Sequence, residues 1–178
     1  MNRNLLLICF LILAQTLEAQ NHRYINITSF GILAGTSADE HEAPLSFISE
    51  HHYRIVKLFS AGLMTGIEQL KENTMPVALN LKLYLPSGKS SFFFSGYGGY
   101  NVSLEKPPDE GIKKAKGGIM TGLETGFFIG INDFASVYVA IGYRYNELDY
   151  KLNDWWIGNY QRHYTFNRFS ARIGIALY

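Results

Sequence analysis

The sequence predicts an all-β protein, an eight-stranded antiparallel up-and-down transmembrane β-barrel. Three observations predict this fold: an export-type N-terminus, eight segments of alternating polarity, and connectors between them that are alternately long and short. In outer-membrane barrels the turns on the periplasmic side are short and the loops on the outer side are longer. The connectors therefore indicate a membrane barrel in particular.

Residues 1–19 have the three parts of a secretory signal peptide. Asn2 and Arg3 give a polar, positive start, Leu5 to Leu13 form an apolar core, and Leu17-Glu18-Ala19 suits cleavage. The apolar core is too short to span a bilayer. We therefore expect a signal peptide over 1–19 and a single barrel domain over 20–178.

The composition favours a membrane barrel and excludes several other classes. Charged residues make up 17% of the chain, below the roughly 25% usual for soluble domains, and aromatic residues make up 15%. The net charge is +1, so no basic field indicates nucleic-acid binding. The single cysteine, Cys9, lies in the expected signal peptide, so we expect no disulfide, no thiolate metal site and no cofactor.

The eight predicted strands differ in how regularly their polarity alternates. Segments 77–85, 135–146 and 169–177 alternate strictly with period two. In a strand this puts the apolar residues on one face, whereas a helix would scatter them around its circumference. Segments 60–69, 91–102 and 118–131 alternate with interruptions, and the run Phe92-Phe93-Phe94 leaves the phase of its strand open. Segments 24–36 and 45–55 alternate least, and we include them mainly because a closed barrel needs them.

The connectors fall into two sets. The short ones are 56–59, 86–90 and 132–134, and the long ones are 37–44, 70–75, 103–117 and 147–166. Because the two kinds alternate along the chain, we expect all short turns at one end of the barrel and all long loops at the other.

The polar face of the strands predicts the lumen. In a soluble barrel the apolar face lines the interior, whereas in a membrane barrel it faces lipid. The polar face carries glycines and few charges, which suits the interior of a narrow barrel, where acidic and basic groups neutralise each other. We therefore predict a lumenal charge network, with Glu124 as partner of Arg144, formed by Glu68, Lys82, Glu124, Arg144 and Arg172. It could line a narrow passage or plug the barrel.

The segments 59–68, 77–85 and 169–178 resemble the small eight-stranded outer-membrane barrels of Gram-negative bacteria, the outer-membrane-protein-A/X-like β-barrel superfamily. The resemblance covers 24–178. It implies a place in the outer membrane, contact with outer-membrane lipid, and insertion by the assembly machinery, which reads a last strand ending in an aromatic residue. Here Tyr178 ends the chain, on the opposite face of the strand from Leu177.

The long connector 147–166 is the candidate for contact with an extracellular ligand. Aromatic and arginine side chains are enriched in binding surfaces, and this connector carries Tyr150, Trp155, Trp156, Tyr160 and Arg162. Alternatively, the two flanking strands extend beyond the membrane, and these aromatic residues pack on each other and on the outer interface.

The sequence therefore predicts a monomeric, non-catalytic outer-membrane barrel with a plugged lumen and a structural or surface-interaction role, without steady porin-like conductance. One alternative is a secreted, lipocalin-like barrel for an apolar ligand, which would need Leu79, Leu81, Leu83, Val139 and Ile173 to point inward. A second alternative is a lipid-modifying barrel enzyme, for which the spacing of His163 with Ser103 or Glu147 gives no support.

Overall fold

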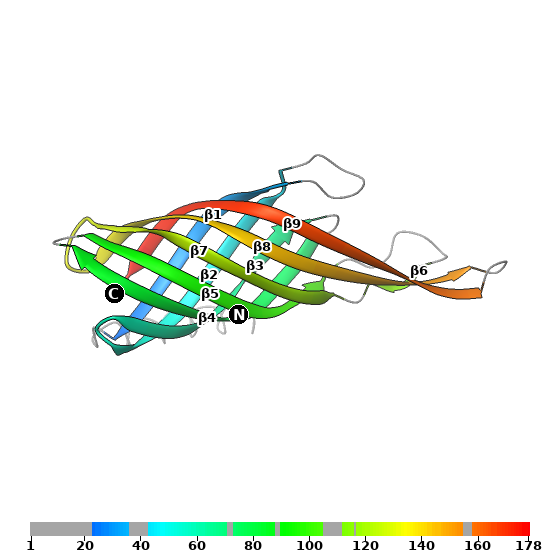
Figure 1. Ribbon diagram of the computed structural model, residues 1–178, viewed down its shortest axis with the longest axis horizontal. Helices are drawn as coiled ribbons and strands as arrows, with labels where there is room; N and C mark the ends of the chain where they lie inside the picture. The colour runs from blue at the N-terminus through cyan, green and yellow to red at the C-terminus, as the bar shows by residue number, and fades with distance from the viewer. Residues whose placement is uncertain are drawn as a thin grey trace, which may run out of the picture.

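Strands of alternating polarity close into an antiparallel barrel in the computed structural model, which describes residues 23–35, 43–70, 73–87, 90–104, 112–115, 117–154 and 158–178 (Figure 1). Within these residues, neighbouring strands pair in the order β1-β2-β3-β4-β5-β7-β8-β9, and β9 pairs with β1 to complete the ring. The strands are β1 (Tyr24–Ala34), β2 (Leu45–Val56), β3 (Phe59–Gln69), β4 (Asn73–Ser87), β5 (Ser90–Ser103), β6 (Ile112–Ala115), β7 (Gly118–Gly130), β8 (Ala135–Asp154) and β9 (Gly158–Leu177). The predicted eight-stranded barrel is confirmed.

The predicted long connector over 70–75 is wrong, and over 147–166 the structure has the alternative of extended flanking strands. β8 and β9 continue as a paired hairpin as far as Asp154 and Gly158, where a loop over 147–166 was expected. The connector predicted over 70–75 is shorter, because β3 ends at Gln69 and β4 begins at Asn73. Figure 1 shows β8 and β9 reaching well beyond the other strands, with β6 beside β8. We call the paired parts of β8 and β9 beyond Asn146 and Phe166 the hairpin extension.

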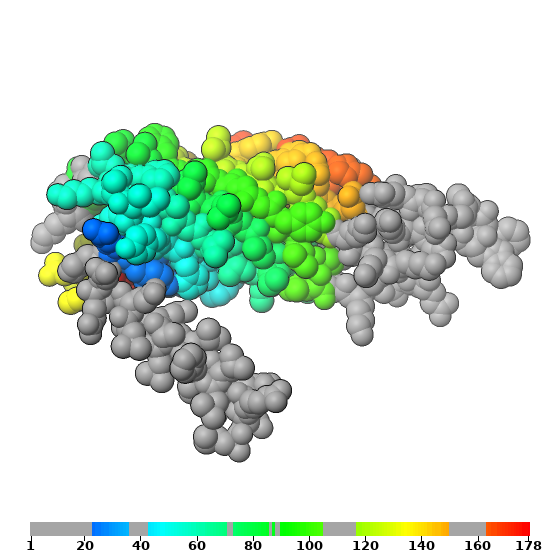
Figure 2. Space-filling view, turned by 90° about the horizontal axis from the view of Figure 1, so that it is seen from below, coloured from blue at the N-terminus to red at the C-terminus, as the bar shows by residue number. Residues whose placement is uncertain are grey.

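Apolar side chains cover the outside of the barrel. Along β4, every second residue from Val77 to Leu85 is exposed, with 67% of Leu79 accessible. Figure 2 shows the wall that β2 to β5 form, in cyan and green. The five residues that a lipocalin-like barrel would turn inward, Leu79, Leu81, Leu83, Val139 and Ile173, are all exposed on this outer wall. Such a wall is stable against lipid acyl chains and not against water.

The three strands of uncertain phase are regular in the structure. On β5, Phe93 points inward, and Phe94 is exposed on the outside. On β1 and β2 the alternation is continuous, but Ile25, Ile27 and Ile48 are buried inside the barrel. The weak pattern of these two strands therefore reflects an interior that is apolar in places.

Apolar clusters occupy the lumen on both sides of its charged centre. One cluster lies toward the end with the short turns and contains Ile25, Ile27, Tyr84, Phe93, Phe128, Tyr138, Ala140 and Ala176, with Tyr178 packed against it. A second cluster lies toward the hairpin extension and contains Leu33, Leu70, Leu148 and Phe166. A third contains Ile48, Met64, Ala78, Tyr97 and Met120. Tyr178 thus lies on the inner side, and its hydroxyl donates to Ser136 Oγ at 3.1 Å.

Candidate functional site: a charged plug in the lumen

The charged residues of the lumen come from six strands. Glu50 is on β2, Glu68 on β3, Lys82 on β4, Glu124 on β7, Arg144 on β8 and Arg172 on β9. Each occupies an inward position of its strand, and none is more than 4% exposed. All five residues of the predicted network therefore lie inside the barrel. Glu50 joins them, although its strand was too irregular for the sequence to indicate its direction.

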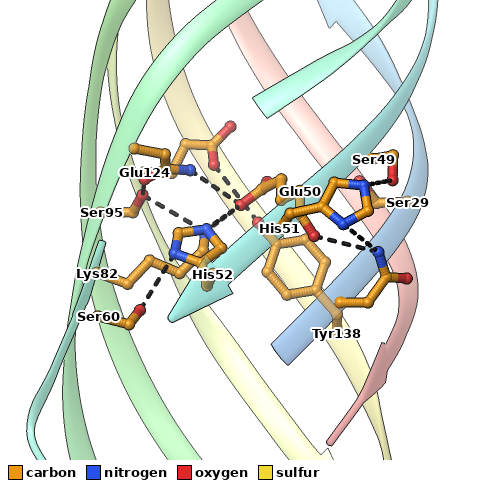
Figure 3. A network of polar contacts seen from close by, with 12 residues as sticks. Ser29, Ser49, Glu50, His51, His52, Ser60, Lys82, Ser95, Glu124 and Tyr138 are labelled. Carbon is orange, nitrogen blue, oxygen red and sulfur yellow. Dashed lines mark hydrogen bonds and ion pairs between the residues drawn. The ribbon is translucent and has the colours of Figure 1, made fainter. Parts of the chain in front are cut away.

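Glu50 is the centre of the first ion-pair group (Figure 3). Its Oε2 accepts hydrogen bonds from Lys82 Nζ, His52 Nε2 and Asn80 Nδ2, each at 2.9 Å. Its Oε1 lies 2.8 Å from Arg172 Nη2. A buried carboxylate is stable only with such partners, because desolvation strongly disfavours an unpaired charge. This group therefore joins β2, β4 and β9 across the lumen.

Arg172 extends the group to the opposite wall. Its guanidinium pairs with the carboxylate of Glu124 and donates to Tyr138 Oη at 2.8 Å. The Lys82 ammonium lies 4.8 Å from the centre of the Phe93 ring and 5.3 Å from that of Tyr138. Charged and aromatic side chains thus alternate across this part of the lumen.

Arg144 belongs to a second group, nearer the hairpin extension. The expected Arg144–Glu124 pair is wrong, because Arg144 Nη1 pairs with Glu68 Oε1 on β3 instead. Ser46 Oγ donates to the same Glu68 oxygen at 2.9 Å, and Arg144 Nε donates to Tyr97 Oη at 2.9 Å. Two separate groups therefore replace the single network that was predicted.

Glycines beside these groups provide the space for large side chains. A Cβ on Gly122 would lie 2.3 Å from Tyr97 Cζ, and a Cβ on Gly142 would lie 2.5 Å from Glu124 Cγ. Neither position could hold a larger residue without displacing the neighbouring side chain. The glycines on the inward face of the strands thus leave space for the large and charged side chains that fill the lumen, which we call the plug.

A serine, a histidine and a carboxylate form a hydrogen-bonded chain within the first group. Ser60 Oγ lies 3.1 Å from His52 Nδ1, and His52 Nε2 donates to Glu50 Oε2. This order of groups is the one used to activate a serine nucleophile. The sequence analysis missed this series of hydrogen bonds, because His52 and Ser60 lie on strands joined by a turn and the directions of their side chains were not known.

The other sequence candidates are only partly within the described structure. The backbone places Tyr150 on β8 and both Tyr160 and Arg162 on β9, in the hairpin extension. Trp155 and Trp156 lie outside the described residues, as does the signal peptide expected over 1–19. Within the described part of the extension, His163 Nδ1 donates to Asp149 Oδ1 at 2.7 Å; His163 is exposed and Asp149 is partly buried.

Among the described residues, no group of three or more histidine, cysteine, aspartate or glutamate side chains is arranged to hold a metal ion. No helix in the described ranges is long and apolar enough to cross a membrane.

Comparison with known proteins shows the fold. No protein-family model matches the chain, and no curated protein matches it by sequence. The outer membrane protein OprG from Pseudomonas aeruginosa is similar in structure, with a TM-score of 0.66 at 12% identity over 87% of this chain and 95% of OprG. Neisserial surface protein A is also similar, with a TM-score of 0.59 at 12% identity over 86% of this chain and 95% of that protein. The outer membrane protein AlkL has a TM-score of 0.57 at 10% identity over 87% of this chain and 89% of AlkL.

The fold and the outer wall together define the class. A closed antiparallel barrel with an apolar exterior and a charged interior is an integral outer-membrane β-barrel. The protein is thus a small transmembrane barrel of the Gram-negative cell envelope, in contact with outer-membrane lipid.

Proposed function

We propose that this protein is a non-catalytic outer-membrane barrel whose lumen is plugged by side chains and whose role is structural or depends on contacts at the cell surface. The observation that carries the proposal is the ion-pair group of Glu50, Lys82, Arg172 and Glu124, which links opposite walls of the lumen. An eight-stranded barrel has an interior only wide enough for side chains to fill, and apolar clusters lie on both sides of the group.

Planar-bilayer recording tests the plug. We expect the unmodified protein to give at most small, intermittent currents. Tyr138→Ala removes a fully buried ring from the centre of the lumen, so the current should rise. Tyr143→Ala is the matched control, because Tyr143 is on the same strand but is exposed on the outer wall. Steady conductance from the unmodified protein would show that the lumen is open.

The absence of catalysis is proposed from the burial of the Ser60–His52–Glu50 chain. None of the three residues is more than 1% exposed, so a lipid substrate has no route to Ser60 Oγ. That oxygen also lies 2.9 Å from Tyr84 Oη, and Glu50 is held by Lys82 and Arg172. We therefore propose that Ser60, His52 and Glu50 belong to the group of side chains that fills the lumen.

A serine-directed probe tests this conclusion against the lipid-modifying alternative. We expect a fluorophosphonate to leave the folded barrel unlabelled, and mass spectrometry to detect no change in phospholipid vesicles that contain the barrel. Labelling that disappears in Ser60→Ala, together with release of fatty acid, would establish a hydrolase instead.

The hairpin extension is the proposed surface for extracellular contacts. The short turns of outer-membrane barrels face the periplasm, which supports a position of the extension outside the cell. Trypsin added to intact cells should then cleave at Lys151 or Arg162, and a chain in which 150–162 is replaced by Asn-Gly should resist. Cleavage only after the outer membrane has been permeabilised would place the extension in the periplasm and overturn this assignment.

A further inference from the structure

Two arginines lie side by side at the end of the barrel that carries the short turns. The backbone amide of Arg54, on β2, donates a hydrogen bond at 2.6 Å to the backbone oxygen of Arg23, which comes just before β1. The inward positions are even-numbered on β2 and odd-numbered on β1. By the period of two, both arginine side chains therefore belong to the mouth of the lumen at this end.

Two aromatic rings hold the Arg54 guanidinium in this mouth. Its Cζ lies 5.4 Å from the centre of the Tyr84 ring and 5.9 Å from that of the Tyr178 ring. The Tyr84 hydroxyl lies 2.9 Å from Ser60 Oγ, and the Tyr178 hydroxyl donates to Ser136 Oγ at 3.1 Å. Both rings are thus fixed by the barrel, so the guanidinium that they attract is held in a defined place.

Arg54 differs from the arginines deeper in the lumen, because it has no acceptor. Arg144 and Arg172 each pair with a carboxylate, and Arg168 donates to the backbone oxygen of Leu33 at 3.2 Å. No hydrogen bond or ion pair joins the Arg54 side chain to another described residue, and its Nε is shielded from solvent without a partner. The ring contacts provide neither a counter-charge nor a hydrogen-bond acceptor for its N–H groups.

The positive charge at this end of the barrel is not balanced by the described residues. Arg23 and Arg54 carry like charges at opposed positions of neighbouring strands, which is unfavourable without a counter-charge. Lys57 adds a third positive charge in the exposed turn after β2. Among the described residues of the short turns, the acidic one is Asp133, which is exposed and pairs with neither arginine. An anion at the mouth would supply the missing counter-charge.

We propose that the mouth of the lumen at the short-turn end binds a phosphate group through Arg54 and Arg23. A guanidinium presents its N–H groups as a planar fork that matches the oxygens of a phosphate. A phosphate monoester carries a charge of about −1.5 to −2 at pH 7, which suits two neighbouring arginines with Lys57 near them. Because the short turns of outer-membrane barrels face the periplasm, the phosphate belongs to a lipid headgroup of the periplasmic leaflet or to a periplasmic solute.

Titration with inorganic phosphate tests the site in the whole barrel, held in micelles of a non-ionic detergent that carries no phosphate. We expect the Nε–H signal of Arg54 in the NMR spectrum to shift during the titration. Calorimetry should give an affinity that Arg54→Gln lowers about tenfold, the loss expected for a charge-assisted hydrogen bond. Arg162→Gln is the matched control, because it removes the same charge from β9 in the hairpin extension, at the other end of the barrel (Figure 1). It should leave the affinity unchanged.

Nanodiscs whose bilayer contains phosphatidylglycerol distinguish the two sources of phosphate. If a headgroup occupies the site, the Arg54 signal in the discs is already shifted from its position in micelles, and inorganic phosphate moves it no further. If a periplasmic solute is the ligand, the signal in the discs moves only when inorganic phosphate is added. Both results support the site.

An Arg54 signal that stays in place in micelles and in discs alike would overturn the proposal. So would equal phosphate affinities of R54Q and R162Q. The NMR titration of the unmodified barrel remains readable even if R54Q fails to fold.

Discussion

Arg144 and Glu68 illustrate how single side chains stabilise the lumen. Both are completely buried, and each is the other's ionic partner. Removing one member of such a pair leaves an uncompensated charge, whose burial is far more unfavourable than the loss of one hydrogen bond. The same reasoning applies to Arg172, which pairs with two carboxylates.

Arg144→Ala should therefore lower the free energy of unfolding by about 3–5 kcal/mol. Urea unfolding of the barrel in lipid vesicles measures this loss. Lys57→Ala, in an exposed turn, is the control and should change the free energy by less than about 0.5 kcal/mol. In the Arg144→Ala, Glu68→Ala double variant the loss should be smaller than the sum of the single losses. An effect of Arg144→Ala as small as that of Lys57→Ala would contradict the pairing.

At the scale of the strand, β4 separates lipid from lumen most regularly. Leu81 is half exposed on the outer wall, and Lys82, the next residue, is buried inside. The reversal of environment over one residue follows from the period of two in a strand. A charged side chain is therefore expected to be tolerated at Lys82 but to destabilise the barrel at Leu81.

Leu81→Arg should destabilise the folded barrel by about 2–4 kcal/mol, because the new charge lies near the middle of the apolar belt. Val56→Arg is the comparison, since Val56 adjoins the turn at Lys57 and a charge near the interface costs only about 0–1 kcal/mol. Equilibrium unfolding in vesicles measures both losses. Equal losses for the two variants would mean that the belt does not extend across Leu81.

The hairpin extension has its own pH dependence. The hydrogen bond from His163 to Asp149 raises the pKa of the His163 ring above its ordinary value of 6.5, and the charge of Glu147 raises it further. A raised pKa means that the ordered extension favours the protonated ring. This stabilisation is complete below the ordinary pKa and is lost as the pH rises through the raised value.

Asp149→Asn should lower the pKa of His163 toward its ordinary value. A titration of the His163 ring protons by NMR, in the barrel held in micelles, measures the shift. An unchanged His163 pKa in the variant would show that the hydrogen bond to Asp149 is not formed in solution.

At the scale of the whole molecule, the apolar exterior and the charged interior require a bilayer. The full chain should fractionate with the outer membrane, and its unboiled form should migrate differently from its boiled form in gel electrophoresis. Leu81→Arg should reduce the amount of the heat-modifiable form. Recovery of the unmodified protein as a soluble periplasmic species without detergent would contradict the assignment of the two faces.

The local pattern was sufficient for the strands whose two faces differ. Lys82, Glu124, Arg144 and Arg172 were assigned to the lumen from the alternation together with the glycines and few charges of that face, and each is buried there. It was insufficient for β2, where Ile48 points inward and Ser49 outward. On that strand some apolar side chains point into the lumen and some polar side chains point outward, so the polarity of a residue no longer predicts the direction of its side chain. The hairpin extension was given only as one of two alternatives for 147–166, and its paired strands correspond to that alternative.

The sequence by itself determined the class of fold, because the period of two and the rhythm of the connectors are properties of neighbouring residues. Only the tertiary structure decided which charges meet. Arg144 lies beside Gly122 and Arg168 in the register of its neighbouring strands, yet its ionic partner is Glu68 on β3. The tilt and stagger of strands in a closed barrel bring residues from distant strands to the same level. A contact across the lumen therefore depends on how the ring closes, which no single segment of the chain encodes.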